Sequence, residues 1–218
     1  MKNILKTILP ILILALVSPL ASFAQQGTPE TQEQSLPSNE ALYQSGIEFG
    51  VFLDQTEKRK DMWHGNFEKG QVSEALQKRA DALHGTFYLI AVAVDGCSDS
   101  VNTIPYLAHL DQASDHISMR VVSPEAGKHI MEAHRTEDGR AATPTVLLLD
   151  EAFTEIGVFI ERPKDLQDWA QGEGKSLSSN EFMKAKFAWY DEDLGNQTMS
   201  EVLDQLEAHL AKSGHQHD

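Results

Sequence analysis

Cysteine and cationic residues are both scarce in this sequence. Cys97 is the single cysteine among 218 residues, which excludes an intramolecular disulfide and a zinc site built on several thiolates. The 18 lysines and arginines are outnumbered by 33 aspartates and glutamates, so the formal net charge is −15. Binding to a phosphate backbone depends on an excess of cations that displaces counterions. The composition therefore argues against a disulfide-stapled domain and against a nucleic-acid-binding protein.

The nine histidines do not form a metal-binding pattern. The sequence has no HExxH motif, and His129 and His134 are five residues apart, so they do not share one face of a helix. His215 and His217 lie in the C-terminal tail. We expect no functional metal site and no bound cofactor.

The most continuous apolar segment near the N-terminus indicates export. Two lysines precede an apolar run at residues 8–17, and Ser22, Phe23 and Ala24 then place small residues at −3 and −1 of a cleavage site. This is the layout of a secretory signal peptide over residues 1–24. The alternative is an uncleaved anchor, but the run is short for a span of about 20 residues. Cleavage would leave a chain of charge −17 with no stable membrane span, in the periplasm or secreted.

Four segments follow the signal peptide. Residues 25–39 are rich in Gln, Ser, Thr and Pro and predict a flexible linker. Residues 40–85 show helical spacing and predict a helical N-terminal extension, with one helix from about 73 to 84. Residues 86–170 alternate apolar strands with helices, and residues 171–218 predict a C-terminal helical region and tail, in which the aromatic side chains between 182 and 190 belong to the core.

The central segment predicts an α/β fold with a mixed sheet. The apolar run at 87–94 is typical of a strand buried on both faces. A helix at 101–110, interrupted by Pro105, joins it to a strand at 117–122, so these two strands should be parallel. A further helix is expected at 125–134. The strands at 145–149 and 156–160 are close enough to form an antiparallel hairpin, and a helix begins at 164.

Cys97 lies in the short loop between the first strand and the following helix. Backbone N–H groups and the positive end of a helix dipole favour a thiolate there. Asp99 opposes this, since a neighbouring carboxylate disfavours a second anion, although a carboxylate also suits a helix N-terminus. Ser100 is three residues from the cysteine and within reach of its sulfur. The loop position predicts a reactive thiol, and the alternative is a buried, inert cysteine.

Three features, at their spacing, resemble a thioredoxin-like protein. They are Cys97-Ser98-Asp99-Ser100 after an apolar strand, Pro105 eight residues after the cysteine, and Thr143-Pro144 about forty-five residues on. The resemblance covers roughly residues 86–170. It implies a thioredoxin-like sandwich with added helices at both ends, and a cis peptide at Thr143-Pro144 beside the sulfur.

The flanking sequences are similar to a bacterial exported subfamily with a Trp-Cys-Gly-Asp-Ser stretch and a helical N-terminal extension. Its Gly-Arg-Ser-Ile-Pro and Trp-Gly-Pro-Arg-Pro stretches would correspond to residues 139–144 and 159–163. Three departures stand out: Ser100 replaces the resolving cysteine, Gly96 replaces a tryptophan, and Ala91 replaces a buried acid. Arg140 and Arg162, within these stretches, are expected to be surface ion-pairing residues.

The resemblance implies monothiol disulfide exchange, since a dithiol cycle needs a second sulfur. Cys97 would be the nucleophile, Ser100 would orient or stabilise its thiolate, and Thr143 and Pro144 would present backbone to an extended substrate. Ser98, Asp99 and Pro105 would belong to the active-site helix. The substrate would be a protein or a small thiol, with glutathione or another external thiol releasing it. One alternative is a non-catalytic peptide-binding or chaperone-like module, and another is a redox sensor that dimerises through Cys97.

Overall fold

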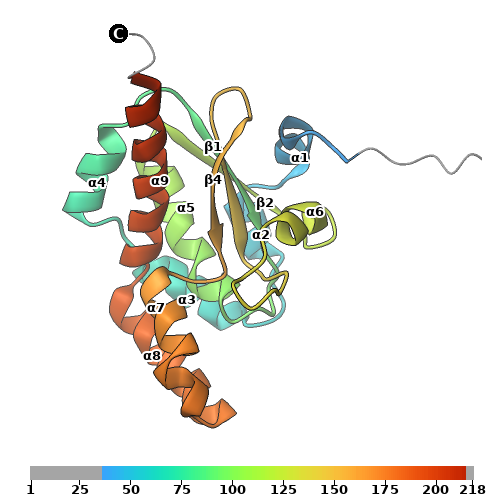
Figure 1. The fold of residues 1–218 in the computed structure, drawn as a ribbon, viewed down its shortest axis with the longest axis vertical. Helices are drawn as coiled ribbons and strands as arrows, with labels where there is room; N and C mark the ends of the chain where they lie inside the picture. The colour runs from blue at the N-terminus through green and yellow to red at the C-terminus, as the bar shows by residue number, and fades with distance from the viewer. Residues whose placement is uncertain (1–35, 215–218) are drawn as a thin grey trace, which may run out of the picture. The chain divides into compact units, whose positions relative to one another are not determined.

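The computed structural model describes residues 36–214 (Figure 1). The predicted signal peptide, residues 25–35 of the predicted linker, and His215 and His217 lie outside these described residues. Ser38 caps the first helix by accepting a hydrogen bond from the Ala41 N–H, so helix α1 (Asn39–Ser45) begins at the last residue of the predicted linker. No helix between residues 36 and 214 is both long and apolar enough to cross a bilayer.

A four-stranded mixed sheet forms the centre of the fold. Its strands are β1 (Phe87–Val92), β2 (Ile117–Val122), β3 (Thr145–Leu149) and β4 (Glu155–Ile160), in the order β2-β1-β3-β4. β1 pairs parallel with β2 and antiparallel with β3, and β3 pairs antiparallel with β4. The predicted α/β class, parallel pair and antiparallel hairpin are therefore confirmed.

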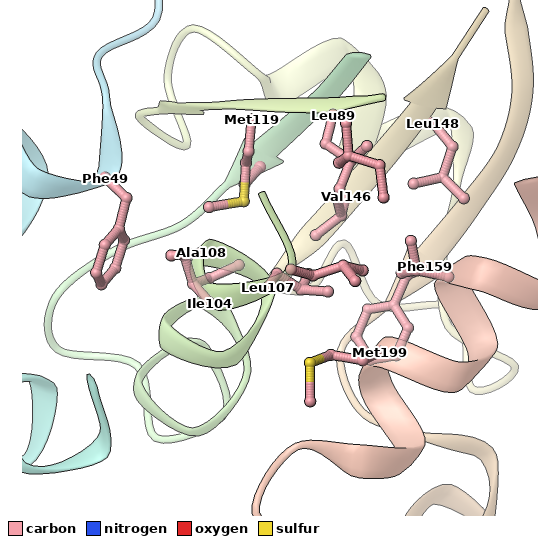
Figure 2. Packing of buried hydrophobic residues seen from close by; sticks show 14 of the residues in the cluster. Phe49, Leu89, Ile104, Leu107, Ala108, Met119, Val146, Leu148, Phe159 and Met199 are labelled. Atoms are coloured by element: carbon pink, nitrogen blue, oxygen red, sulfur yellow. The ribbon is translucent and has the colours of Figure 1, made fainter. Parts of the chain in front are cut away.

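β1 is apolar throughout because helices cover both faces of the sheet. Leu89 and Ala91 point into the larger core, with α5 (Ile104–Ala113) and α9 (Asn196–Gly214). Figure 2 shows Leu89, Val146 and Leu148 above the side chains of α5, with Phe159 close to Met199 of α9. Ile90 and Val92 point to the other face, where α1 and α6 (Lys128–Ala133) pack. α6 is shorter than the predicted helix at 125–134.

The helical N-terminal extension is part of this fold. After α1 it contains α2 (Phe49–Asp54), α3 (Lys60–Lys69) and α4 (Glu74–Asp81). Trp63 of α3 is completely buried in the larger core, and Ile47 forms an antiparallel bridge with Val121 at the edge of β2. Gly70 ends α3, and Ser73 caps α4.

The helix after Cys97 differs from the expectation. A 3₁₀ turn, η1 (Ser100–Asn102), comes first, and α5 begins after Thr103. Pro105 lies in the first turn of α5, where its missing N–H removes no intrahelical hydrogen bond. The expectation that Pro105 interrupts a helix was therefore wrong, because the break falls at Thr103.

The C-terminal region contains separate helices. α7 (Lys164–Gln171) is followed by a 3₁₀ turn, η2 (Glu173–Ser176). α8 (Ser179–Asp193) begins with a capping box between Ser178 and Glu181. α8 and α9 meet at Gly195, which has a φ of 75° and lies so close to Tyr106 that a Cβ would be 2.2 Å from its Cγ.

Candidate functional site

The Cys97 loop follows the carboxyl end of β1 and approaches the Thr143-Pro144 peptide. The thiol of the half-buried Cys97 donates to the carbonyl oxygen of Thr143, with an Sγ···O distance of 3.1 Å. The Ser100 N–H donates to the same sulfur at 3.5 Å. The Thr143-Pro144 peptide is cis, as predicted. The structure therefore brings Cys97, Ser100 and the Thr143-Pro144 peptide to one place.

Ser100 contacts the sulfur through its backbone. Its side chain is fully buried, and its hydroxyl has no hydrogen-bond partner among residues 36–214. A buried hydroxyl without a partner is costly. The contact that the sequence suggested for the Ser100 side chain is thus made by its N–H group, which any residue except proline could supply.

The N-terminal extension binds the chain immediately before Cys97. The Asp95 Oδ2 accepts hydrogen bonds from the N–H groups of Glu57 and Lys58, at 3.1 and 2.8 Å. These bonds stabilise the carboxylate, chiefly the one from Lys58, and lower the pKa of Asp95. The Trp63 indole donates to the Asp95 carbonyl at 3.0 Å. The position of the Cys97 loop thus depends on the loop between α2 and α3 and on α3 itself.

The same extension binds the chain after Cys97. The side-chain amide of the buried Asn66 donates to the Val101 carbonyl at 2.7 Å and to the Asn102 Oδ1 at 2.9 Å. Asn102 in turn donates to the Ser98 carbonyl at 2.7 Å. Both ends of the Cys97 loop are therefore hydrogen-bonded to α3, directly or through one residue.

Asp99 lies at the centre of a buried charged cluster. Its Oδ2 is 2.9 Å from the Lys186 ammonium and 3.4 Å from the Arg162 guanidinium, and the Tyr190 hydroxyl donates to its Oδ1 at 2.9 Å. The Lys186 ammonium also donates to the Ser98 hydroxyl oxygen at 2.8 Å. Burial and the Asp99 charge raise the pKa of Tyr190 well above its usual value. Ser98 and Asp99 of the Cys-x-x-Ser motif are thus hydrogen-bonded to side chains of α8.

The charged cluster continues toward the surface. Glu161 accepts from Arg162 at 2.7 Å and forms a two-point ion pair with Arg140 at 3.0 and 3.1 Å. Arg140 also pairs with Asp138. The Arg140 side chain is 53% exposed and that of Arg162 only 10%, so the expectation of a surface ion pair is right for Arg140 and wrong for Arg162. These residues border a cleft of about 600 Å³, which Gln167 and Phe182 also line.

Sequence reasoning missed Lys186, because a lysine within an apolar helix is ordinarily exposed. One signal was available: Lys186 precedes Tyr190 by four residues, which places both on the same face of α8. Of the aromatic residues between 182 and 190 that were expected in the core, Tyr190 is buried, whereas Phe182, Phe187 and Trp189 are only half-buried, so that expectation is right for Tyr190 alone. A lysine on a core-facing stripe needs a buried anion, and Asp99 is that anion. No group of three or more metal-binding side chains is found between residues 36 and 214.

Comparison with known proteins agrees with this fold. No curated protein matches the chain. A solved structure of a protein of unknown function from Pseudomonas aeruginosa superposes with a TM-score of 0.65 at 20% identity, covering 79% of this chain and 99% of that one. An HIV epitope scaffold gives a TM-score of 0.63 at 20% identity over the same shares. A family model described as thioredoxin matches residues 46–187, which is more than half of the sequence, so the chain belongs to the thioredoxin family.

Proposed function

We propose that this protein is an exported thioredoxin-like protein that exchanges disulfides through a single cysteine. The observation that carries the proposal is the half-buried Cys97 sulfur 3.1 Å from the Thr143 carbonyl, beside a cis peptide and within reach of the Ser100 N–H. Removal of residues 1–24 would place this thiol in the periplasm or outside the cell, where disulfides persist.

The proposed reaction begins with attack by the Cys97 thiolate on a substrate disulfide. The substrate S–S bond breaks, one sulfur becomes bonded to Cys97, and the other leaves as a thiolate that takes up a proton. Thr143 and Pro144 would present backbone to the segment that carries the bound sulfur. Ser98 and Asp99, bonded to Lys186, and Pro105 at the start of α5 would fix the loop.

Release requires a thiol from outside the chain, since Cys97 is the only cysteine. Glutathione, another small thiol or a partner protein would attack the mixed disulfide. The new disulfide joins that thiol to the substrate sulfur, and Cys97 leaves as a thiolate. The chain itself needs no bound cofactor for this exchange.

Intact-mass analysis after incubation with oxidised glutathione tests the proposal. We expect a stable one-to-one adduct that Cys97→Ser abolishes, together with poor catalysis of insulin reduction by dithiothreitol. A Cys97 that reacts only after denaturation, or rapid insulin reduction by the unmodified protein, would contradict monothiol exchange. N-terminal sequencing of the native protein tests export, with Gln25 as the expected first residue.

A second candidate function is peptide binding without chemistry. The serine at the resolving position favours it, because its buried hydroxyl has no hydrogen-bond partner within residues 36–214 and it is the Ser100 N–H that donates to the sulfur. Disulfide exchange requires the Cys97 sulfur, whereas peptide binding without chemistry does not. Cys97→Ser would abolish capture of a disulfide-bearing peptide by an exchange protein, and would leave the affinity of a binding module for the reduced peptide unchanged.

A further inference from the structure

The space next to Gly96 is occupied by a lysine of the N-terminal extension. A side chain at position 96 would begin 3.0 Å from the Cδ and 3.9 Å from the Nζ of Lys58. Lys58 is exposed and belongs to the loop between α2 and α3. Gly96, the residue before Cys97, has no side chain, and the Lys58 side chain lies where a side chain at position 96 would begin.

Arg59 approaches the same point. Its Nε donates at 2.9 Å to the Gly96 carbonyl, which belongs to the peptide bond that joins Gly96 to Cys97. Its guanidinium carbon lies 5.9 Å from the centre of the Phe187 ring of α8. Arg59 is exposed and has a positive φ of 54° at the start of α3. The cation is therefore fixed between α3, the Cys97 loop and α8.

Neither of these cations forms an ion pair with a carboxylate among residues 36–214, although the Lys58 charge contributes to the lowered pKa of Asp95. Among residues 36–214, every other arginine forms an ion pair within 4 Å, namely Arg79, Arg120, Arg135, Arg140 and Arg162. Asp95 is the acid of the same loop, but its Oδ2 accepts from backbone N–H groups, and it forms no ion pair with Lys58 in the described part of the chain. Several exposed lysines of the described residues also lack an ion pair, but Arg59 is the only arginine among residues 36–214 without one, and both cations lie beside the residue before Cys97.

We propose that Lys58 and Arg59 select disulfides that carry a carboxylate close to the sulfur. This inference rests on the proposed exchange at Cys97 and names the substrate class of that site. An anionic group beside the attacked sulfur is attracted by the two cations, which raises its local concentration and the rate of encounter. The shared chemistry can come from a small acidic disulfide or from an acidic polypeptide segment.

Three disulfides that share two methylenes between each sulfur and the terminal group, and that differ in charge, test the selection. Rates of mixed-disulfide formation at Cys97 are measured with dithiodipropionate, hydroxyethyl disulfide and cystamine, which are anionic, neutral and cationic. After each rate is divided by the rate of the same reagent with a small neutral thiol, which removes the effect of the leaving-group pKa, we expect the anionic reagent to react about tenfold faster than the cationic one at low ionic strength. The difference should largely disappear at about 1 M salt, where the Debye length is about 3 Å. If only the net negative charge of the whole protein mattered, the cationic cystamine would react faster than the anionic dithiodipropionate.

Charge-removing variants locate the effect. Lys58→Gln and Arg59→Gln should each lower the ratio of anionic to cationic rates by about threefold to tenfold. Lys212→Gln, a change of equal charge in the last turn of α9, should leave the ratio unchanged. An unchanged ratio in both loop variants, or a faster reaction of cystamine with the unmodified protein, would overturn the inference.

The outcomes separate this inference from the proposed function. If Cys97 reacts with none of the three disulfides in the folded protein, the proposed exchange fails. If it reacts with all three at equal rates, the exchange stands and the selection fails. If the anionic reagent is favoured, the selection holds, and two further substrates are compared: glutathione disulfide and a dimeric peptide with glutamate next to cysteine. The one whose rate falls more in Arg59→Gln identifies the source of the carboxylate.

Discussion

The ammonium nitrogen of Lys186 lies 2.9 Å from the Oδ2 of Asp99, and the two side chains are only 3% and 7% exposed. Such a pair costs desolvation energy when it forms, but breaking it leaves an uncompensated charge in the core. Asp99 is the third residue of the Cys-x-x-Ser motif and Lys186 belongs to α8. Helix α8 therefore supports the Cys97 loop through this buried ion pair.

Removal of the buried ammonium should be strongly destabilising. Lys186→Met is expected to lower the free energy of unfolding by about 3 kcal/mol, because Asp99 then keeps only Arg162 and Tyr190 as partners. Adding Asp99→Asn should restore part of the loss, since a neutral amide does not require the cation. Urea denaturation measures both.

An exposed ion pair provides the control. Lys69 and Asp191 are 2.6 Å apart with side chains 41% and 63% exposed, so Lys69→Met should cost under about 1 kcal/mol. Equal losses in Lys186→Met and Lys69→Met would mean that the buried pair contributes nothing special to stability.

Asn66 should determine how firmly the Cys97 loop is held. Asn66→Ala removes hydrogen bonds to the Val101 carbonyl and to Asn102, and leaves buried acceptors without a donor. We expect a loss of about 1–3 kcal/mol and faster amide hydrogen exchange in residues 97–103. Gln77→Ala, which removes side-chain bonds to Asp81 and to the Ala113 carbonyl, should leave exchange at 97–103 unchanged. Unchanged exchange in Asn66→Ala would contradict the role of α3 as a support.

The sequence predicts the sheet well because its signals are local. Two local features show this: the apolar run determines β1, and the short connection determines the antiparallel pairing of β3 and β4, each without reference to the rest of the chain. The cis peptide beside Cys97 was implied by the family resemblance. The fold and the position of the Cys97 sulfur beside the Thr143-Pro144 peptide were therefore predictable from the sequence and the family resemblance.

The surroundings of Cys97 were not predictable in the same way. Four residues reach the loop from about 30 to 90 positions away: Lys58, Arg59, Asn66 and Lys186. The neighbours of the first three give no sign of it. For Lys186 the spacing to Tyr190 indicates a buried face, but charged residues are exposed by default, as Lys184 two positions earlier is, and the sequence does not show that Asp99 is the partner. Long-range polar contacts depend on tertiary geometry, which a pattern of apolar residues does not encode.

The stability of the protein should fall at alkaline pH through Tyr106. Burial, with a contribution from Asp191 and Asp193, raises the pKa of Tyr106 to about 12. Its value in the unfolded chain is about 10. A raised folded pKa contributes stability that is fully present below the unfolded pKa and is lost as pH rises through the folded pKa. The loss should therefore occur between about pH 10 and 12 and be on the order of 2 kcal/mol.

Tyr106→Phe checks this assignment. The variant has no phenol at this position, so its stability should decline less than that of the parent over the same pH interval in urea denaturation. Tyr190, whose pKa is also raised, keeps part of the decline in both proteins. Parallel stability curves for parent and variant would mean that the Tyr106 phenol ionises equally in the folded and unfolded states.

A cysteine introduced at Ser100 should supply the resolving thiol that the chain lacks. The Ser100 N–H is already 3.5 Å from the Cys97 sulfur, and the Ser100 hydroxyl has no partner to lose among the described residues. Ser100→Cys would create a Cys-x-x-Cys pair in which the second thiol attacks the mixed disulfide and releases the substrate. We expect insulin reduction with dithiothreitol to increase at least about tenfold, and the glutathione adduct to become short-lived.

Ser100→Ala is the matched control for Ser100→Cys. It removes a buried hydroxyl that has no hydrogen-bond partner in the described part of the chain, so the fold should be as stable as the parent or slightly more stable. Its glutathione adduct should persist as in the parent, because no resolving thiol is added. If Ser100→Cys forms the internal disulfide, seen in intact mass as the loss of two hydrogen atoms, and turnover still does not rise, substrate does not reach Cys97 in a reactive geometry. That result would favour the peptide-binding function over disulfide exchange.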